Sequence, residues 1–273
     1  MIHHRLRSDT ARRRLRWWIL ASGLVLFLGL TYLAESEPRP KLEPSAGADA
    51  LAEAMIAAVH GQAWQETGAV RWTFRGSRQH LWDRKRQLER ARWDDVEVLI
   101  DLATRQGRAW KQGEEVAGPE RDKLVEKAWE AWVNDSFWLN PVVKAFDEGT
   151  RRGLVQLDGN DRGLLVEYSS GGVTPGDAYL WILGPDDRPV RWKMWVSIIP
   201  VGGVEASWEG WTELETGALV ATRHKLALGK VDLTDVAGAA NLTDLEPGPD
   251  PFAPLLAAGS EAAGAAPAAG SGP

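Results

Sequence analysis

The sequence contains no cysteine in its 273 residues. A disulfide framework is therefore excluded, and a folded domain must be held together by its own apolar core. Lipid attachment at an amino-terminal cysteine is excluded for the same reason. Long apolar runs are scarce as well, and a single stretch, residues 17–34, continues for 18 residues without a charge.

Residue patterns typical of metal or cofactor sites are also missing. Of the five histidines, three lie beyond residue 34, at His60, His80 and His224, too far apart in sequence for the close pairs usual in zinc sites. No glycine-rich phosphate loop opens a helix, and no serine has a G-x-S-x-G context. We therefore expect no metal, no cofactor and no catalytic residue.

The amino terminus has the features of a membrane anchor. Residues 1–16 hold six arginines and one acidic residue, and we interpret them as a cytoplasmic basic stub. At 1.5 Å per residue, a helix over 17–34 is just long enough to cross a hydrocarbon core of about 30 Å. Because the arginines precede it and Glu35 and Glu37 follow it, the sequence predicts a single-pass inner-membrane signal anchor and a periplasmic domain.

A cleaved signal peptide is the alternative to this anchor. Cleavage after Ala34 is disfavoured because it would place bulky Tyr32 where a small side chain is needed. Either way the rest of the chain is exported. Its net charge is more negative than the −6 of the whole chain, since the stub is basic, and this excludes a nucleic-acid-binding protein.

The exported part divides into three segments. Residues 35–47 are polar and rich in proline, which predicts an extended linker. Residues 246–273 consist mostly of alanine, glycine, proline and serine, which predicts a disordered tail. Residues 48–245 between them form one domain.

Two segments of this domain have helical periodicity. Over 48–62, Leu51, Met55 and Val59 fall on one face, and over 119–134 an apolar stripe follows a proline in the first turn. The remaining segments alternate with period two between turns of Gly, Pro, Asn and Asp, as in antiparallel hairpins. We therefore expect an α+β fold: a curved antiparallel sheet, an unclosed half-barrel, with two amphipathic helices against its concave face.

The strand over 189–198 indicates which face of the sheet is buried. It places Val190, Trp192, Met194 and Val196 on one apolar face, and Trp208 falls on the same face of a later strand. The opposite face is polar and we expect it to be solvated. Three tryptophans are assigned to that polar face: Trp181, Trp195 and Trp211.

Tryptophan is the aromatic residue in excess, with fifteen against three tyrosines and five phenylalanines. A large sheet presents more apolar area than two short helices cover, which favours a cavity lined by large side chains. Five residues at the end of the second helix would form its lid: Trp129, Trp132, Phe137, Trp138 and Leu139. Five strand residues would form its wall: Val190, Trp192, Met194, Val196 and Trp208. Ordinary core packing is the alternative for each of them.

The run "NDSFWLNPVVKAFDEG" and the later run "YLWILGPDDRPVRWKMWVSIIPVGGVEASWEGW" carry a family resemblance. Over about residues 48–235 the chain resembles the LolA/LolB-type lipoprotein carriers of the bacterial envelope, and more closely uncharacterised bacterial exported proteins of that fold. The residues behind the closer resemblance are Trp138, Leu139, Pro141, Asp147 and Gly149. It implies an unclosed antiparallel barrel lidded by helices, with an apolar cavity for acyl chains. A role in lipoprotein sorting is not implied, because an anchored chain without a lipidated cysteine departs from these carriers.

Three functions remain open at this point. The first is a membrane-anchored envelope protein that binds a lipid or an acylated ligand in a hydrophobic cavity. The second is a non-catalytic envelope scaffold with a filled core, which would bind a protein partner or lipid headgroups through the basic residues Arg84, Lys85, Arg86, Arg90 and Arg92. The third is a glycan hydrolase that uses Asp135 and Asp147 as its carboxylate pair beside the aromatic residues.

Overall fold

The structure, a computed structural model, describes residues 36–157, 159, 161–170 and 176–257. The predicted basic stub and membrane anchor lie outside these residues. Within the part of the chain that is described, no helix is long and apolar enough to cross a membrane.

Thirteen strands form one antiparallel sheet in the order β6-β5-β4-β3-β2-β1-β15-β14-β11-β10-β9-β8-β7. One half contains β1 (Ala69–Phe74), β2 (Arg78–Asp83), β3 (Leu88–Trp93), β4 (Val96–Asp101), β5 (Gly107–Lys111) and β6 (Glu114–Val116). The other contains β7 (Thr150–Gln156), β8 (Arg162–Tyr168), β9 (Ala178–Leu183), β10 (Pro189–Trp195), β11 (Val204–Ser207), β14 (Arg223–Leu226) and β15 (Gly229–Ala239). A two-stranded sheet joins β12 (Thr212–Glu213) to β13 (Leu219–Val220).

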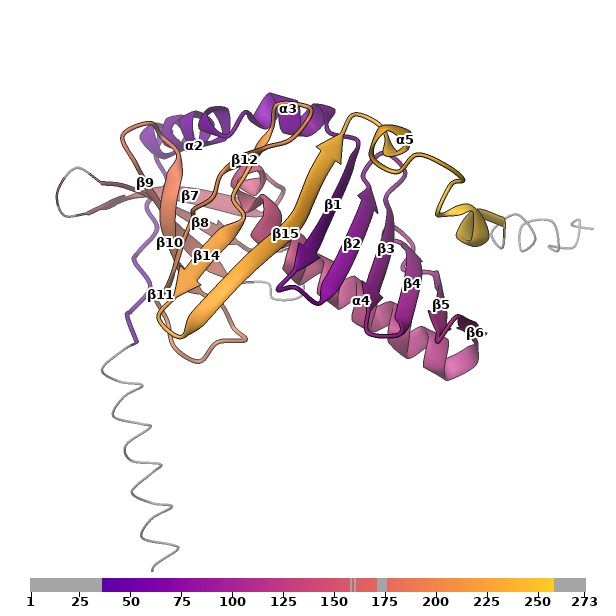
Figure 1. Cartoon of the computed structure of the whole chain (residues 1–273). Coiled ribbons are helices and arrows are strands. Elements are labelled where there is room, and N and C mark those ends of the chain that lie inside the picture. The colour runs from indigo at the N-terminus through magenta and orange to yellow at the C-terminus, as the bar shows by residue number, and fades with distance from the viewer. Residues whose placement is uncertain (1–35, 158, 160, 171–175, 258–273) are drawn as a thin grey trace, which may run out of the picture.

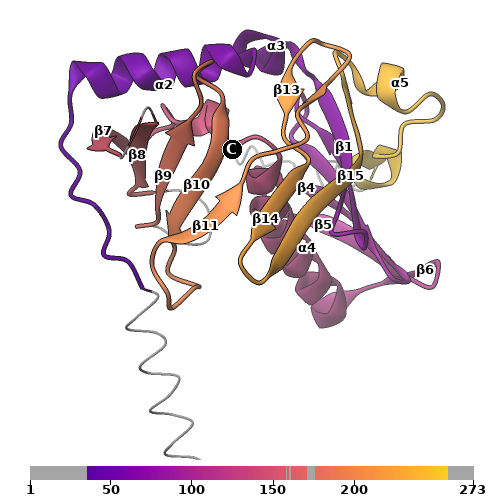
Figure 2. The ribbon, with the colours of Figure 1, turned by 60° about the vertical axis from the view of Figure 1, so that its left-hand side comes forward.

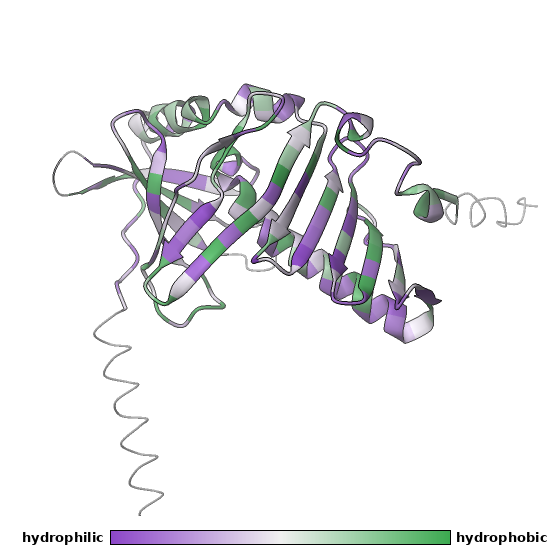
Figure 3. Ribbon diagram, in the orientation of Figure 1, coloured by the Kyte–Doolittle hydropathy of each residue, from purple (hydrophilic) through white to green (hydrophobic). Residues whose placement is uncertain are grey.

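The large sheet is strongly curved and stays open, because the outermost strands β6 and β7 are not paired with each other (Figures 1 and 2). Hydrophilic and hydrophobic residues alternate along strands such as β15 (Figure 3). This alternation follows from the period of two in a strand and gives the sheet two chemically different faces. The predicted α+β architecture with an unclosed antiparallel sheet is confirmed.

The helices are α2 (Ala46–Ala58), α3 (Gly61–Glu66), α4 (Gly118–Leu139), η1 (Pro141–Lys144) and α5 (Leu242–Leu245). In Figure 1, α4 runs behind β1–β6, and Figure 2 shows α2 along the upper end of β7–β10. The helix expected over 48–62 is divided in two. The break lies at His60, which adopts a left-handed backbone conformation with φ of 56°.

Side chains at the helix ends explain where α2 and α4 begin and end. The Ser45 hydroxyl accepts a hydrogen bond from the Ala48 amide, which satisfies one of the free N–H groups of the first turn of α2. Pro119 occupies the first turn of α4, where its missing N–H costs nothing. Pro141 ends α4, because a proline restricts the residue before it to extended conformations.

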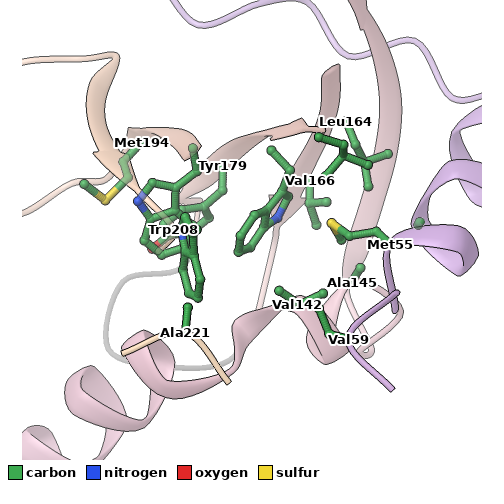
Figure 4. Close-up of a cluster of buried hydrophobic side chains, with 14 of the residues drawn as sticks. Met55, Val59, Val142, Ala145, Leu164, Val166, Tyr179, Met194, Trp208 and Ala221 are labelled. Atoms are coloured by element: carbon green, nitrogen blue, oxygen red, sulfur yellow. The ribbon is translucent and has the colours of Figure 1, made fainter. Parts of the chain in front are cut away.

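The concave face of the sheet holds most of the core. Val125 and Ala128 of α4 pack on Val98, Ile100 and Ala109 of β4 and β5. At the other half, residues from α2, η1, the position directly after each of these helices, and β8 come together: Met55, Val59, Val142, Ala145, Leu164 and Val166 (Figure 4). Each half of the sheet is therefore covered on this side by a helix of its own.

The amino-terminal segment covers the opposite face of β8–β10. Leu42 packs there with Leu165, Leu180 and Ile182. Two hydrogen bonds hold the segment farther along: the Glu37 amide donates to the Gly202 carbonyl at 2.9 Å, and Trp195 Nε1 donates to the Glu37 carbonyl at 2.8 Å. The extended linker expected over 35–47 thus packs on the sheet where the structure describes it, because this face is apolar and needs a cover.

The carboxy-terminal segment covers the same face of the other half. Phe252 is fully buried in a cluster with Leu81, Leu88 and Leu99, and Arg86 forms two hydrogen bonds to Asp250, at 2.6 and 3.0 Å. The prediction of a disordered tail is therefore wrong for residues 246–257, whereas residues 258–273 lie outside the described part.

Replacing Phe252 tests this cover. We expect Phe252→Ala to lower the free energy of unfolding by about 3 kcal/mol, because a fully buried ring leaves a cavity. Leu256→Ala, at a side chain that is 46% exposed, serves as the control and should change it by less than about 0.5 kcal/mol. Urea denaturation followed by tryptophan fluorescence measures both free energies of unfolding. If the two variants lose the same small amount of stability, the segment is not part of the folded unit.

Candidate functional site

The most concentrated aromatic packing lies between the last turn of α4 and strands β8–β11. We call this region the aromatic interior. Its members are Phe137, Trp138, Tyr168, Tyr179, Trp181, Trp192, Trp208 and His224. Their rings meet mostly edge to face or tilted, the arrangements that aromatic quadrupoles favour.

Trp192 is the centre of the aromatic interior and is fully buried. Its ring centroid lies 5.2 Å from that of Trp138, 4.9 Å from that of Trp181 and 5.0 Å from that of Trp208. Strand register explains one of these contacts, because Trp192 of β10 pairs directly with Trp181 of β9. The site is thus built by three neighbouring strands on one side and the end of α4 on the other.

The structure brings together part of the predicted lid and most of the predicted wall. Phe137 and Trp138 are half-buried and pack against the cluster that contains the wall residues Trp192, Met194, Val196 and Trp208. These predicted site residues therefore share one location. Their part in binding a ligand remains a prediction.

The other predicted lid residues, which also belong to α4, pack in other clusters. Trp129 packs on β3–β5, with the Arg105 guanidinium 3.6 Å from its ring centroid. Trp132 meets the Trp82 ring edge to face, and Leu139 is fully buried in that neighbouring cluster. The 22-residue helix α4 packs mainly on β3–β5 and reaches the other cluster with its last turn, so its apolar stripe contributes to more than one cluster.

Val190 does not line the aromatic interior. The register between β9 and β10 shifts between Pro189 and Arg191, and such a bulge reverses the direction of the side chains that follow. Val190 is consequently 39% exposed although Trp192 is fully buried. The prediction of this wall residue is wrong, because simple alternation cannot reveal a bulge.

Trp181 is the main residue that the sequence assigned to the wrong face. Every position of β9 is buried, and Trp181 points to the same side as Trp192. Trp211, also expected on the solvated face, is partly buried against the same cluster. The signal was present in "AYLWIL", since a strand without polar alternation is typical of burial on both faces.

Several polar atoms of this region are buried without a hydrogen-bond partner among the described residues. They are Nε1 of Trp181, Trp192 and Trp208, Nε2 of His224, the hydroxyl of Tyr168 and both amide atoms of Asn140. An unpaired buried polar group costs about 1–3 kcal/mol. The aromatic interior is therefore an apolar cluster that also contains unused donors and acceptors.

His224 contributes a neutral imidazole to this set. Its Nδ1 lies 3.0 Å from the Ser207 carbonyl, which accepts only, so Nδ1 carries the hydrogen and Nε2 is a free acceptor. Burial lowers the pKa of His224 to about 4, and the ring is uncharged at neutral pH.

A second polar group lies under α4, next to the aromatic interior. We call it the ionic cluster, and it consists of Arg78, His80, Glu89 and Asp135. Asp135 accepts from Arg78 at 2.6 and 2.7 Å and from His80 Nε2 at 2.9 Å, while His80 Nδ1 donates to Glu89 at 2.7 Å. These bonds tie α4 to β2 and β3, and the Trp72 ring stacks on His80 at 4.5 Å.

Two opposing effects determine the pKa values in the ionic cluster: burial, and the hydrogen bonds between its members. Burial opposes the charged form of His80, but its bonds to Asp135 and Glu89 outweigh this and raise its pKa to about 9. Burial raises the pKa of Glu89 to about 7. The pKa of Asp135 stays below its usual range despite burial, because His80 and Arg78 donate to it.

The two carboxylates proposed for glycan hydrolysis have separate partners. Asp135 is fully buried within the ionic cluster. Asp147 is exposed and bonded to Lys144. A hydrolytic pair needs both carboxylates at one substrate, and these two face different surroundings.

No protein-family model matches the sequence, and no curated protein is significantly similar to it. The solved structures similar to this chain include two that it covers over most of their length. One is a DUF1329 family protein from Desulfovibrio piger, with 12% identity, 73% of this chain and 96% of that chain covered, and a TM-score of 0.37. The other, from Vibrio parahaemolyticus, is a domain assigned to outer membrane lipoprotein sorting, with 9% identity, 75% and 98% covered, and a TM-score of 0.35.

The ionic cluster generates a prediction about pH. The folded-state pKa of His80, about 9, lies above the ordinary value of 6.5, so its stabilisation is complete below pH 6.5 and is lost as pH rises through 9. The wild type should therefore be more stable than His80→Gln at pH 6, and this difference should shrink by up to about 3 kcal/mol by pH 9.5. Urea denaturation across this range measures it, and a difference that does not change with pH contradicts a charged His80.

Proposed function

We propose that the protein is a non-enzymatic envelope protein, anchored in the inner membrane through residues 17–34, whose periplasmic half-barrel binds a lipid or a lipidated ligand. The observation that carries this proposal is the set of unpartnered polar atoms within the aromatic interior. An apolar lining with a few free donors and acceptors suits an amphiphile better than it suits a purely apolar core.

The chemistry of an acyl ester or amide matches this lining. Its chain would gain about 0.8 kcal/mol for each methylene moved from water to the tryptophan walls. Its carbonyl would accept from an indole N–H of Trp181, Trp192 or Trp208, and this would relieve the penalty of an unpaired buried donor.

Phe137 and Trp138 must move to admit such a ligand, because both rings pack directly on Trp192. The ionic cluster holds α4 at Asp135, so the movement is confined to the turn that follows. Asn140 marks its end, with an extended φ of −156° and both amide atoms unpartnered. The last turn of α4 is therefore the lid of the proposed site.

A matched pair of tryptophans on α4 tests ligand binding. Trp138→Leu removes a ring from the aromatic interior, whereas Trp129→Leu removes one from the cluster on β3–β5. We expect a fluorescent fatty acid to bind the wild type and Trp129→Leu alike, and to bind Trp138→Leu at least about tenfold more weakly, as loss of an aromatic contact of about 1.4 kcal/mol implies.

Native mass spectrometry of the detergent-purified protein provides the independent readout. A bound lipid that persists in the wild type supports the proposal. A protein without bound lipid and without any response to the fluorescent fatty acid contradicts it.

The Tyr168 hydroxyl allows a test that separates binding from folding. It is buried and unpartnered, so Tyr168→Phe removes a group that stabilises nothing in the fold, and the unfolding free energy should stay equal or rise. If the hydroxyl bonds the polar end of the ligand, the same variant binds the fluorescent fatty acid about threefold to tenfold more weakly. Unchanged affinity would exclude Tyr168 from the site.

An envelope scaffold with a filled core is the second candidate, and the full burial of Trp192 favours it. Its marker would be a protein partner that is retained by Trp138→Leu and lost on charge reversal of the basic residues. Arg84 and Arg86 are unsuitable for that test, because Arg84 donates to backbone carbonyls and Arg86 is paired with Asp83 and Asp250. Lys85, whose side chain is exposed, is the informative position.

A further inference from the structure

A small cleft lies on the face of the sheet that is turned away from α4, at the level of the ionic cluster. Its volume is about 300 Å³, and strands β1, β2, β3 and β15 form its floor together with the end of α5. Six of its lining residues carry the argument: Arg71, Thr73, Gln79, Arg90, Arg92 and Glu246.

Strand register concentrates positive charge in this cleft. Arg71 of β1 and Arg90 of β3 both pair with Leu81 of the strand between them, and Arg92 pairs with Gln79 in the next row. All of these side chains leave the sheet on the same side, because positions two apart share a face. Three guanidinium groups thus line one small volume together with two carboxylates, Glu246 and Asp235, and the latter accepts from the Thr73 hydroxyl at 2.9 Å.

The only carboxylate near two of these arginines is loosely placed. Among the described residues, Glu246 Oε1 lies 3.8 Å from Arg71 Nη1 and 3.7 Å from Arg90 Nη2. Charge-assisted hydrogen bonds are about 2.7–2.9 Å long, so neither contact is one. Arg71 Nη1 donates instead to the Leu245 carbonyl at 3.2 Å. Arg92, in contrast, is bonded to Glu97.

Arg90 is the arginine of this cleft whose charge is most buried. Its side chain is 15% exposed. Among the described residues, Glu246 is the one carboxylate within 4 Å of its guanidinium group. Burial and the neighbouring charge of Arg92 lower its pKa more than the carboxylates of Glu246, Glu97 and Glu89 raise it, so its charged form is only partly compensated where it stands. A bound anion would supply that compensation.

We propose that this cleft is a binding site for a phosphate group, held between Arg71 and Arg90, with Glu246 as an internal competitor for the same position. Guanidinium groups recognise phosphate through parallel pairs of N–H bonds, and two converging arginines can address two of its oxygens each. Gln79, at the floor of the cleft, adds an uncharged amide donor.

The cleft has room for more than the phosphate. It shares Gln79 and Arg92 with a second cleft of about 670 Å³ on the same face, which is lined by Trp110, Glu97 and the turn at Asp94 and Asp95. A polar group attached to the phosphate would lie along this second cleft, where its carbon atoms would contact the half-buried Trp110 ring. A phosphorylated lipid headgroup and free phosphate are the two sources of this chemistry.

Titration calorimetry on the full chain in a zwitterionic detergent tests the site. The probes are inorganic phosphate and dihexanoyl phosphatidylglycerol below its critical micelle concentration. Tighter binding of the second probe identifies a headgroup as the source, equal or weaker binding identifies free phosphate, and both outcomes support the phosphate site. Binding of neither probe overturns it.

Three variants locate the binding. Arg90→Gln should weaken phosphate binding at least about tenfold, since it removes a charged donor. Glu246→Gln should strengthen it about threefold to tenfold, because the competing carboxylate is gone. Arg75→Gln, at an exposed turn outside the cleft, is the matched control and should leave it unchanged.

Glu246→Gln keeps the test decisive if Arg90→Gln fails to fold. A loss of affinity in Glu246→Gln, or an affinity that stays the same, overturns the role of Glu246 and with it the site. Trp138→Leu should bind phosphate like the wild type, because the aromatic interior lies on the other face of the sheet. The result for the phosphate site is therefore independent of the result for the proposed lipid binding.

Discussion

The attachment of α4 to the sheet through Asp135 determines how the rest of the concave face is organised. Asp135 is fully buried, and it holds α4 in place only because Arg78 and His80 of β2 donate to it. Removing one partner would leave a buried charge uncompensated, which is strongly destabilising. Every residue of α4 beyond Asp135 is thereby positioned, including the two rings that reach the aromatic interior.

The second constraint is that both faces of the sheet are apolar in places. A sheet of this size needs covers on two sides, and the concave side receives α2 and α4. The other side is covered by the two terminal segments, through Leu42 at one half and Phe252 at the other. The region around Arg71 and Arg90 is polar and open, so the cleft there lies where the cover of the sheet ends.

Local patterns were sufficient to predict the hairpins, the two helices and the open antiparallel sheet, because turn residues and periodicity act over a few positions. The bulge that exposes Val190 depends on pairing with the neighbouring strand, which no single strand encodes. The burial of Trp181, in contrast, could have been predicted from the uniformly apolar strand β9. The ionic cluster was missed for a related reason. His80 and Asp135 are 55 residues apart, and their proximity results from the packing of α4 on β2.

The ionic cluster and the phosphate cleft share a strand, and this links the two faces of the sheet. Glu89 and Arg90 are adjacent in β3, so their side chains leave the sheet on opposite sides, one toward His80 and the other into the cleft. The charge of Arg90 acts through the strand to lower the pKa of Glu89, against the larger effect of burial. Arg90 therefore stands close enough to the ionic cluster for its charge to act on Glu89, although burial and the contact with His80 have the larger effects on that carboxyl.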